Sequence, residues 1–315
     1  TKQIGPEHEH SCNVIVPVDE SRVTGTPFIS QNFWVFDHTT KKGYCAGRAG
    51  GSFGQVDYGV NVNGKIYFAI YGGGQLTEYD PDAPAGYPIN PRLVAATDQG
   101  QHGAGITTDG QLVWAAFKPK YGTLDGAMIR YNTKTGAATY REGALQAQHI
   151  INPIFENTNG TLVAGTSWLA DAESATPVHS TAFAVVLNPD TMDIVAKAPA
   201  PEGVDTAINY GPIGHNQWLF QCANNLFVFD TASTTLAPYE KRPNLPEDTV
   251  KLLYAGKPGH FLIQIGTELQ QWNTDTNTFE PLATFAEGFV NRWWINGPDL
   301  TFDCGSYAAV WRNCL

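Results

Sequence analysis

The sequence predicts an all-β protein, a seven-bladed β-propeller that forms a single domain over residues 1–315. The main observation is a motif in which an apolar or aromatic strand ends in Asp or Asn, and a short polar turn follows. It occurs at Phe36-Asp37, Tyr79-Asp80, Tyr131-Asn132, Leu187-Asn188, Phe229-Asp230 and Trp272-Asn273, and again at Trp311-Arg312-Asn313. Successive motifs lie 40–56 residues apart, which is the range expected of four-stranded propeller blades. The 32 Gly and 20 Pro residues suit many short strands joined by tight turns.

Blade two shows the predicted order of four strands most clearly. The expected strands are Asp57–Val62, Lys65–Tyr71, Gln75–Asp80 and Arg92–Thr97. Asn63-Gly64 joins the first two, and Asn-Gly between alternating apolar runs is the strongest short-range signal of a hairpin. Blade one is expected over residues 11–46, with Asn32–Phe36 as its third strand.

The last repeat ends at Leu315, directly after its third strand. We expect the segment Thr1–Glu9 to supply the missing fourth strand, so that the two chain ends share the last blade. This closure would remove the exposed sheet edges that otherwise invite aggregation. It also predicts that the termini lie close together.

Two short segments are similar to elements of known propeller families. Tyr131-Asn132-Thr133-Lys134-Thr135-Gly136 looks like the strand and turn of quinoprotein-like repeats, and Gly72-Gly73-Gly74 resembles the Gly doublets of kelch repeats. The chain therefore resembles the seven-bladed β-propeller superfamily over nearly its whole length. The Gly-His and Trp-Asp signatures of WD40 blades are missing, as is the Ser-x-Asp-x-Gly-x-Thr-Trp box of sialidases. The resemblance implies the fold and assigns no catalytic residue to this chain.

The charge balance argues against two classes of partner. The formal net charge is −11, with only 19 Lys and Arg residues, so we expect no binding to nucleic acid and none to an anionic membrane. No apolar run approaches the ~20 residues that a membrane-spanning helix needs. Low total charge (16%) and the sequon Asn159-Gly160-Thr161 favour a secreted protein, which we expect to be a monomer.

Five cysteines cannot all pair within the chain. They are Cys12, Cys45, Cys222, Cys304 and Cys314. Cys222 follows the apolar strand pattern Trp218-Leu219-Phe220-Gln221, so we expect it to be the buried, unpaired one.

Propeller topology predicts where a binding site lies. Loops from the second to the third strand of a blade emerge on the same face as loops between successive blades. The two longest repeats contain insertions in such second-to-third-strand loops, at 118–126 and 168–180. Polar residues also mark the entries to the innermost strands: Gln55, Asp57, Gln101, His102, Gln148 and His149. They predict a ring of acid–base or ligand groups at the channel mouth, with hydrogen bonding to a water-filled channel as the alternative.

The insertion at 118–126 begins with two lysines and a tyrosine, which is unusual in so acidic a chain. Cleavage of a uronate glycan by β-elimination needs a positive charge that neutralises the substrate carboxylate. It also needs a base that removes the proton α to the carboxylate and an acid that protonates the leaving oxygen. The predicted catalytic residues are His102, His149 and Tyr121. The predicted substrate-binding residues are Gln55, Asp57, Gln101, Gln148, Lys118, Lys120, Trp168 and Tyr71, the two aromatic ones offering a surface for sugar rings. We therefore expect a polysaccharide lyase that acts on an acidic glycan; alternatively, the lysines only keep an exposed loop soluble.

The sequence also fits other functions. His10, His102 and His149 are candidate ligands of a divalent metal ion, because imidazoles from separate strands can leave an open coordination position. A glycoside hydrolase that uses Asp57, Asp205 and Asp248 is the next enzyme class. The non-catalytic alternative is a binding module, either a lectin or a protein-interaction scaffold. Propeller lectins tend to repeat their binding residues, whereas the polar entries here concentrate in blades two to five, which favours a single site.

Overall fold

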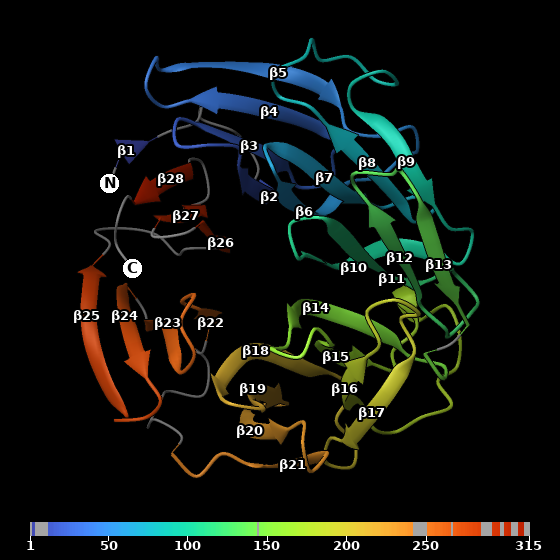
Figure 1. The fold of residues 1–315 in the computed structure, drawn as a ribbon, viewed down its shortest axis with the longest axis vertical. Coiled ribbons are helices and arrows are strands. Elements are labelled where there is room, and N and C mark those ends of the chain that lie inside the picture. The colour runs from blue at the N-terminus through green and yellow to red at the C-terminus, as the bar shows by residue number, and fades with distance from the viewer. Residues whose placement is uncertain are drawn as a thin grey trace.

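The computed structural model describes residues 2–3, 12–143, 145–241, 251–265, 267–284, 292–296, 299–303 and 308–311. Within these residues, the strands form seven four-stranded antiparallel sheets. The sheets are arranged around a central axis, and the all-β propeller predicted from the sequence is confirmed (Figure 1). The same residues contain no helix long and apolar enough to cross a membrane.

Six of the sheets within the described residues are blades of four consecutive strands each. Blade one contains β2 (Cys12–Pro17), β3 (Arg22–Pro27), β4 (Asn32–Asp37) and β5 (Lys42–Arg48). Blade two contains β6 (Val56–Val62), β7 (Lys65–Ile70), β8 (Gln75–Tyr79) and β9 (Arg92–Ala96), close to the predicted bounds. Blade three contains β10 (Gly100–Thr108), β11 (Leu112–Pro119), β12 (Ala127–Asn132) and β13 (Ala138–Glu142).

The next three blades repeat this arrangement. Blade four contains β14 (His149–Glu156), β15 (Leu162–Ser167), β16 (Phe183–Leu187) and β17 (Ile194–Pro199), with the 3-10 helix η1 (Asp171–Glu173) between β15 and β16. Blade five contains β18 (Ala207–Gly214), β19 (Gln217–Cys222), β20 (Asn225–Asp230) and β21 (Thr235–Pro238). Blade six contains β22 (Lys251–Tyr254), β23 (His260–Ile265), β24 (Glu268–Asn273) and β25 (Thr278–Thr284).

The remaining sheet joins the two ends of the chain. It contains β26 (Arg292–Asn296), β27 (Asp299–Asp303), β28 (Ala308–Trp311) and β1 (Lys2–Gln3). Lys2 lies opposite Val310 and Gln3 opposite Ala309. The N-terminal strand therefore pairs with the last strand of the chain, as predicted; residues 4–9 of the expected closing segment lie outside the described residues.

The recurring Asp or Asn has a local structural role. Oδ1 of Asp37 accepts hydrogen bonds from the backbone N–H groups of Thr39 (2.7 Å) and Thr40 (3.1 Å). The same two-bond turn occurs at Asn132, Asn188, Asp230 and Asn273. These are Asx turns, in which the side chain replaces a backbone acceptor and reverses the chain. The backbone N–H of Thr40 stabilises the charged carboxylate and lowers the pKa of Asp37.

Neighbouring blades bury their apolar faces against one another. Between blades one and two, the packed side chains are Val14, Val16, Phe33, Val35, Val56, Ile66, Phe68, Ile70 and Tyr79. The approach is closest between blades four and five, where a Cβ at Gly165 would lie 1.7 Å from the carbonyl oxygen of Ala207. Only glycine fits at that point of contact. Cys222 is buried as predicted, in the core of blades four and five, and burial raises the pKa of its thiol to about 12.

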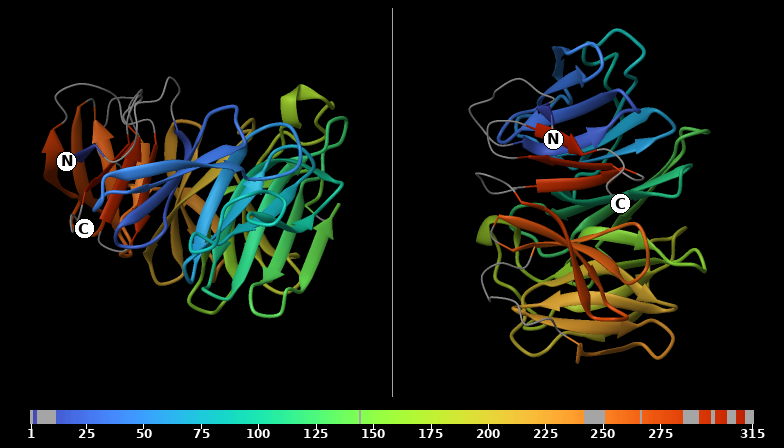
Figure 2. Two further views of the ribbon diagram at one scale, coloured as in Figure 1. Left: turned by 90° about the horizontal axis from the view of Figure 1, so that it is seen from above. Right: turned by 90° about the vertical axis from the view of Figure 1, so that its left-hand side faces the viewer.

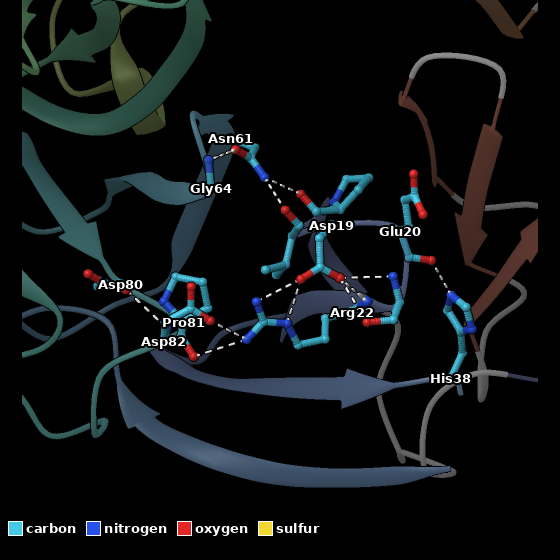
Figure 3. Close-up of polar contacts among 12 residues, drawn as sticks. Asp19, Glu20, Arg22, His38, Asn61, Gly64, Asp80, Pro81 and Asp82 are labelled. Atoms are coloured by element: carbon cyan, nitrogen blue, oxygen red, sulfur yellow. Dashed lines mark hydrogen bonds and ion pairs between the residues drawn. The ribbon is translucent and has the colours of Figure 1, made fainter. Parts of the chain in front are cut away.

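Polar contacts also connect blades one and two, on the face that carries the hairpins between third and fourth strands. Arg22 forms ion pairs with Asp19 (2.6 Å) and with Asp82 (2.8 Å), which belongs to the β8–β9 connection (Figure 3). Asn61 in β6 donates hydrogen bonds to the carbonyl oxygens of Pro17 and Val18 (Figure 3). Such partly exposed ion pairs contribute about 0–1 kcal/mol each, so the buried apolar faces dominate the contact.

Loss of the N-terminal strand should destabilise the fold. Deleting residues 1–3 removes β1 and leaves β28 without its outer partner, so we expect a lower melting temperature. Each kcal/mol lost lowers Tm by about 2–4 °C in domains of some 150–250 residues. Deleting Thr1 alone is the matched control, because it keeps both paired residues. Equal melting temperatures of the two truncated proteins in calorimetry would contradict the role of β1.

Candidate functional site

The connections that form one face of the disc carry most of the predicted site residues. Both predicted insertions lie where expected, in the β11–β12 connection (120–126) and the β15–β16 connection (168–182). Figure 2 shows η1, in the second of these, standing on one face of the ring. The β5–β6 and β7–β8 connections emerge on the same face by the antiparallel order of the strands.

His102, near the start of β10, is at the centre of the site. Its Nδ1 lies 3.4 Å from Oδ2 of Asp57, and its Nε2 lies 3.7 Å from Oδ2 of Asp171. The two carboxylates are 8% and 5% exposed, whereas a quarter of the His102 side chain is exposed. The imidazole is therefore accessible to a ligand, while the groups on either side of it are shielded from solvent.

Asp57 is fixed by neighbours on its own and the next blade. Its Oδ1 accepts a hydrogen bond from Nε2 of Gln55 (2.7 Å), and its Oδ2 accepts one from the backbone N–H of Gly103 (2.6 Å). Gln55 in turn accepts a hydrogen bond from the backbone N–H of Ile29 (3.2 Å). The structure thus brings the predicted residues Gln55, Asp57 and His102 together, with Gln55 acting on the site through Asp57.

Tyr71 covers one side of His102 and connects it to Tyr121. The Tyr71 ring stacks on the imidazole with a centroid distance of 3.8 Å and an interplanar angle of 2°. The Tyr71 and Tyr121 hydroxyls lie 3.0 Å apart. This hydrogen bond, together with desolvation, raises the pKa of Tyr121 to about 12. A hydrogen bond with Gln101 acts to lower this pKa. Tyr121 is therefore protonated at neutral pH and can donate a proton.

The two predicted lysines have different surroundings. Nζ of Lys118 lies 3.5 Å from Oδ1 of the buried Asp171. Lys118 therefore already has a carboxylate partner within the protein. Lys120 is exposed, and its backbone N–H donates a hydrogen bond to the carbonyl oxygen of Gln99.

Three other predicted residues are held by packing or hydrogen bonds within the protein. His149 is 3% exposed, and desolvation together with the charge of Lys118 lowers its pKa to about 3. Gln148 is also buried, and its amide bonds the carbonyl oxygen of Thr181 (3.0 Å). Trp168 donates its indole N–H to the carbonyl oxygen of Val204 (3.0 Å) and packs against the core of blades four and five. Gln148 thus forms hydrogen bonds within blade four, and Trp168 connects blade four to the segment that leads into blade five.

The predicted metal ligands are not brought together within the described part of the chain. There, no three His, Cys, Asp or Glu side chains form a group that could hold a metal ion. His10 lies outside the described residues, so the site formed with His102 and His149 stays a prediction. Asp205 is exposed, and Asp248 also lies outside the described residues, so the carboxylate set of the glycoside hydrolase alternative stays a prediction.

Sequence reasoning missed Asp171. The sequence predicts the insertion that carries it and the face on which this insertion lies, and Asp171 and Glu173 are two acidic residues within it. Its inward position depends on the left-handed backbone of Ala172 (φ 51°) and Glu173 (φ 54°). Neither residue type indicates that conformation, so no sequence pattern would have shown Asp171 turning toward His102.

Comparison with known proteins supports the fold alone. No family model and no curated protein matches the sequence. Among solved structures, a chain of the "Mitotic Checkpoint Complex" gives a TM-score of 0.64 at 8% identity, covering 99% of this chain and 91% of that chain. Saccharomyces cerevisiae Sqt1 gives 0.60 at 13% identity, covering 96% and 83%. The "Dos1 propeller" gives 0.57 at 11% identity, covering 98% and 93%. The TM-scores show a shared β-propeller architecture, and because the identities are so low they show the fold alone.

The buried His149 should make stability depend on pH. Its pKa is about 3 in the folded protein and about 6.5 when unfolded, so the unfolded chain binds more protons between these values. The stabilisation from neutral His149 is complete above pH about 6.5 and is lost as pH falls toward about 3. We expect His149→Gln to flatten the dependence of unfolding free energy on pH in this window, measured by urea denaturation. Parallel curves for the variant and the wild type would contradict the burial of a neutral imidazole.

Proposed function

We propose that the protein is a carbohydrate-active enzyme, a polysaccharide lyase that cleaves an acidic glycan with His102 as its base. One observation carries this proposal. The accessible imidazole of His102 lies between two shielded carboxylates and against Tyr71, which is hydrogen-bonded to Tyr121. This arrangement contains the base and the acid that β-elimination requires, on the face that carries both long insertions.

The proposed reaction follows from the positions of His102 and Tyr121. His102 removes the proton α to the uronate carboxylate, so that its imidazole ring becomes positively charged. The neighbouring carboxylates of Asp57 and Asp171 stabilise this positive charge. A carbon–carbon double bond forms as the bond to the glycosidic oxygen breaks. Tyr121, held protonated by its hydrogen bond with Tyr71, donates its proton to the leaving oxygen. The products are a new reducing end and an unsaturated sugar.

Positive charge near His102 supports an anionic substrate. Lys118 offsets the buried Asp171, which reduces the repulsion between this carboxylate and a substrate carboxylate. Lys120 is exposed in the adjoining loop and is available to bind the uronate group. In this proposal the two lysines therefore have separate roles: Lys118 acts within the protein and Lys120 on the substrate.

Two further aspects of the sequence-based expectation are part of the proposal. The sheet that β26–β28 form with β1 acts as a seventh blade that closes the ring, which is supported by the pairing of Lys2 with Val310. The protein acts as a secreted monomer, for which the support is that the sequon residue Asn159 is exposed in the turn between β14 and β15.

A binding module is the second candidate function. Ile29 and Phe53 are 73% and 92% exposed in the β3–β4 and β5–β6 connections, on the same face as His102. The hydrogen bond from Ile29 to Gln55 joins this apolar surface to the site. A lectin or scaffold would bind through these residues and would not depend on proton transfer by His102.

His102→Ala should separate the two candidates. We expect kcat toward a uronate polysaccharide to fall by about 10²–10⁴-fold, because the base is lost, with little change in melting temperature. Activity is measured by the absorbance of the unsaturated product. His215→Ala, an exposed histidine in the β18–β19 turn of the opposite face, is the control. If no uronate glycan is cleaved by the wild type, yet one binds and this binding survives in His102→Ala, the protein is a binding module.

Lys120→Gln should weaken the interaction with an acidic glycan. We expect KM to rise at low ionic strength and the difference from wild type to shrink at high salt, where charges are screened. Lys134→Gln is the control, because Lys134 is exposed in a turn between β12 and β13 on the opposite face. A KM equal to that of the wild type at low salt would show that Lys120 does not bind the substrate carboxylate.

A further inference from the structure

Asp171 has a carboxylate that is buried and only partly satisfied. The residue is 5% exposed, and its Oδ1 faces Lys118 at 3.5 Å. Among the described residues, its Oδ2 has no hydrogen-bond partner. The same atom is the one that faces Nε2 of His102 at 3.7 Å. A buried carboxylate oxygen without a partner is unfavourable, so its direction toward the imidazole requires a reason.

The local backbone holds Asp171 in this position at a cost. Ala172 and Glu173 both adopt left-handed conformations, which are uncommon for residues with a side chain and typical of strained functional turns. Oγ of Ser174 accepts a hydrogen bond from the backbone N–H of Gly122 (3.0 Å). This bond ties the β15–β16 insertion to the loop that carries Tyr121. Two long connections from different blades are therefore held together beside His102.

The two carboxylates face opposite nitrogens of one ring. With Asp57 near Nδ1 and Asp171 near Nε2, a neutral ring has a single N–H and can donate to only one of them. At 3.7 Å the Nε2 contact exceeds the normal length of an N–H···O hydrogen bond. Once the ring is protonated on both nitrogens, each N–H faces a carboxylate, and the contacts become charge-assisted.

We propose that Asp171 is a positioning residue, which stabilises the protonated form of His102 and makes the β15–β16 insertion part of the catalytic apparatus. This inference rests on the proposed function, in which His102 accepts a proton. The groups that face or adjoin the ring come from five places: Asp57 from β6, Tyr71 after β7, Lys118 from β11, Tyr121 in the β11–β12 connection and Asp171 from η1. Of these, Asp57 and Asp171 favour the protonated ring, and Lys118 opposes it.

The test uses Asp171→Asn, with Glu173→Gln as a control that removes one negative charge from an exposed position in the same turn. The side-chain nitrogen signals of His102 are recorded by NMR in the full chain, and its own signals are assigned with His102→Ala. At pH about 6, we expect a smaller fraction of doubly protonated His102 in Asp171→Asn than in wild type, and no change in Glu173→Gln. Lys118→Met should raise that fraction, which provides an independent variant if Asp171→Asn does not fold.

The kinetic outcome complements the NMR result. On a uronate glycan, we expect Asp171→Asn to lower kcat about tenfold or more with little change in KM, because the residue acts in proton transfer. Unchanged His102 signals in both Asp171→Asn and Lys118→Met would overturn the inference, even if the enzyme is active. If no glycan is cleaved by the wild type but the signals change as expected, the coupling of Asp171 to His102 stands and the proposed lyase function fails.

Discussion

The burial of one blade against the next is the constraint on which this structure depends. A four-stranded sheet with two apolar faces cannot be stable in water alone, so each blade requires a neighbour on either side. The aromatic and branched side chains of β4, β7 and β8 meet this need between blades one and two, and the contact of Gly165 with Ala207 meets it between blades four and five. Such packing places the first strand of every blade nearest the axis. The residues that enter those strands are thereby brought close together, although they lie far apart in the sequence.

The site depends on this convergence. Asp57 and His102 enter neighbouring blades, and the backbone N–H of Gly103 binds Asp57 across the boundary between them. Asp171 reaches the same place from a longer connection in blade four. The assembly is polar in its shielded part and aromatic at its rim, where Tyr71 stacks on His102 and is hydrogen-bonded to Tyr121. No single blade contains enough of these groups to form the site.

The sequence predicted the fold better than it predicted the site, for physical reasons. The Asx turn at Asp37 and its counterparts is a local structure, and its residue types are visible in any repeat. The strands of blade two followed from their alternation and from Asn63-Gly64 for the same reason. His102 and His149 have the same residue type and a similar place in the repeat, yet one is accessible and the other is buried. Burial of a strand entry depends on packing against parts of the chain that are distant in sequence, which no local pattern encodes. Asp171 depends on two left-handed residues that the sequence does not mark.

The Asx turns have a consequence for how this scaffold can diversify. They lie in the hairpins between third and fourth strands, on the face away from His102. One face of the disc therefore sets strand register, and the other carries the reactive groups. Substitutions and insertions in the loops around His102 leave the Asx turns unchanged. The chemistry of these loops can therefore change without disturbing the pairing of the strands. A protein built on this plan can change the side chains around His102 while the blades that contain these turns keep the hydrogen bonds that fix their hairpins.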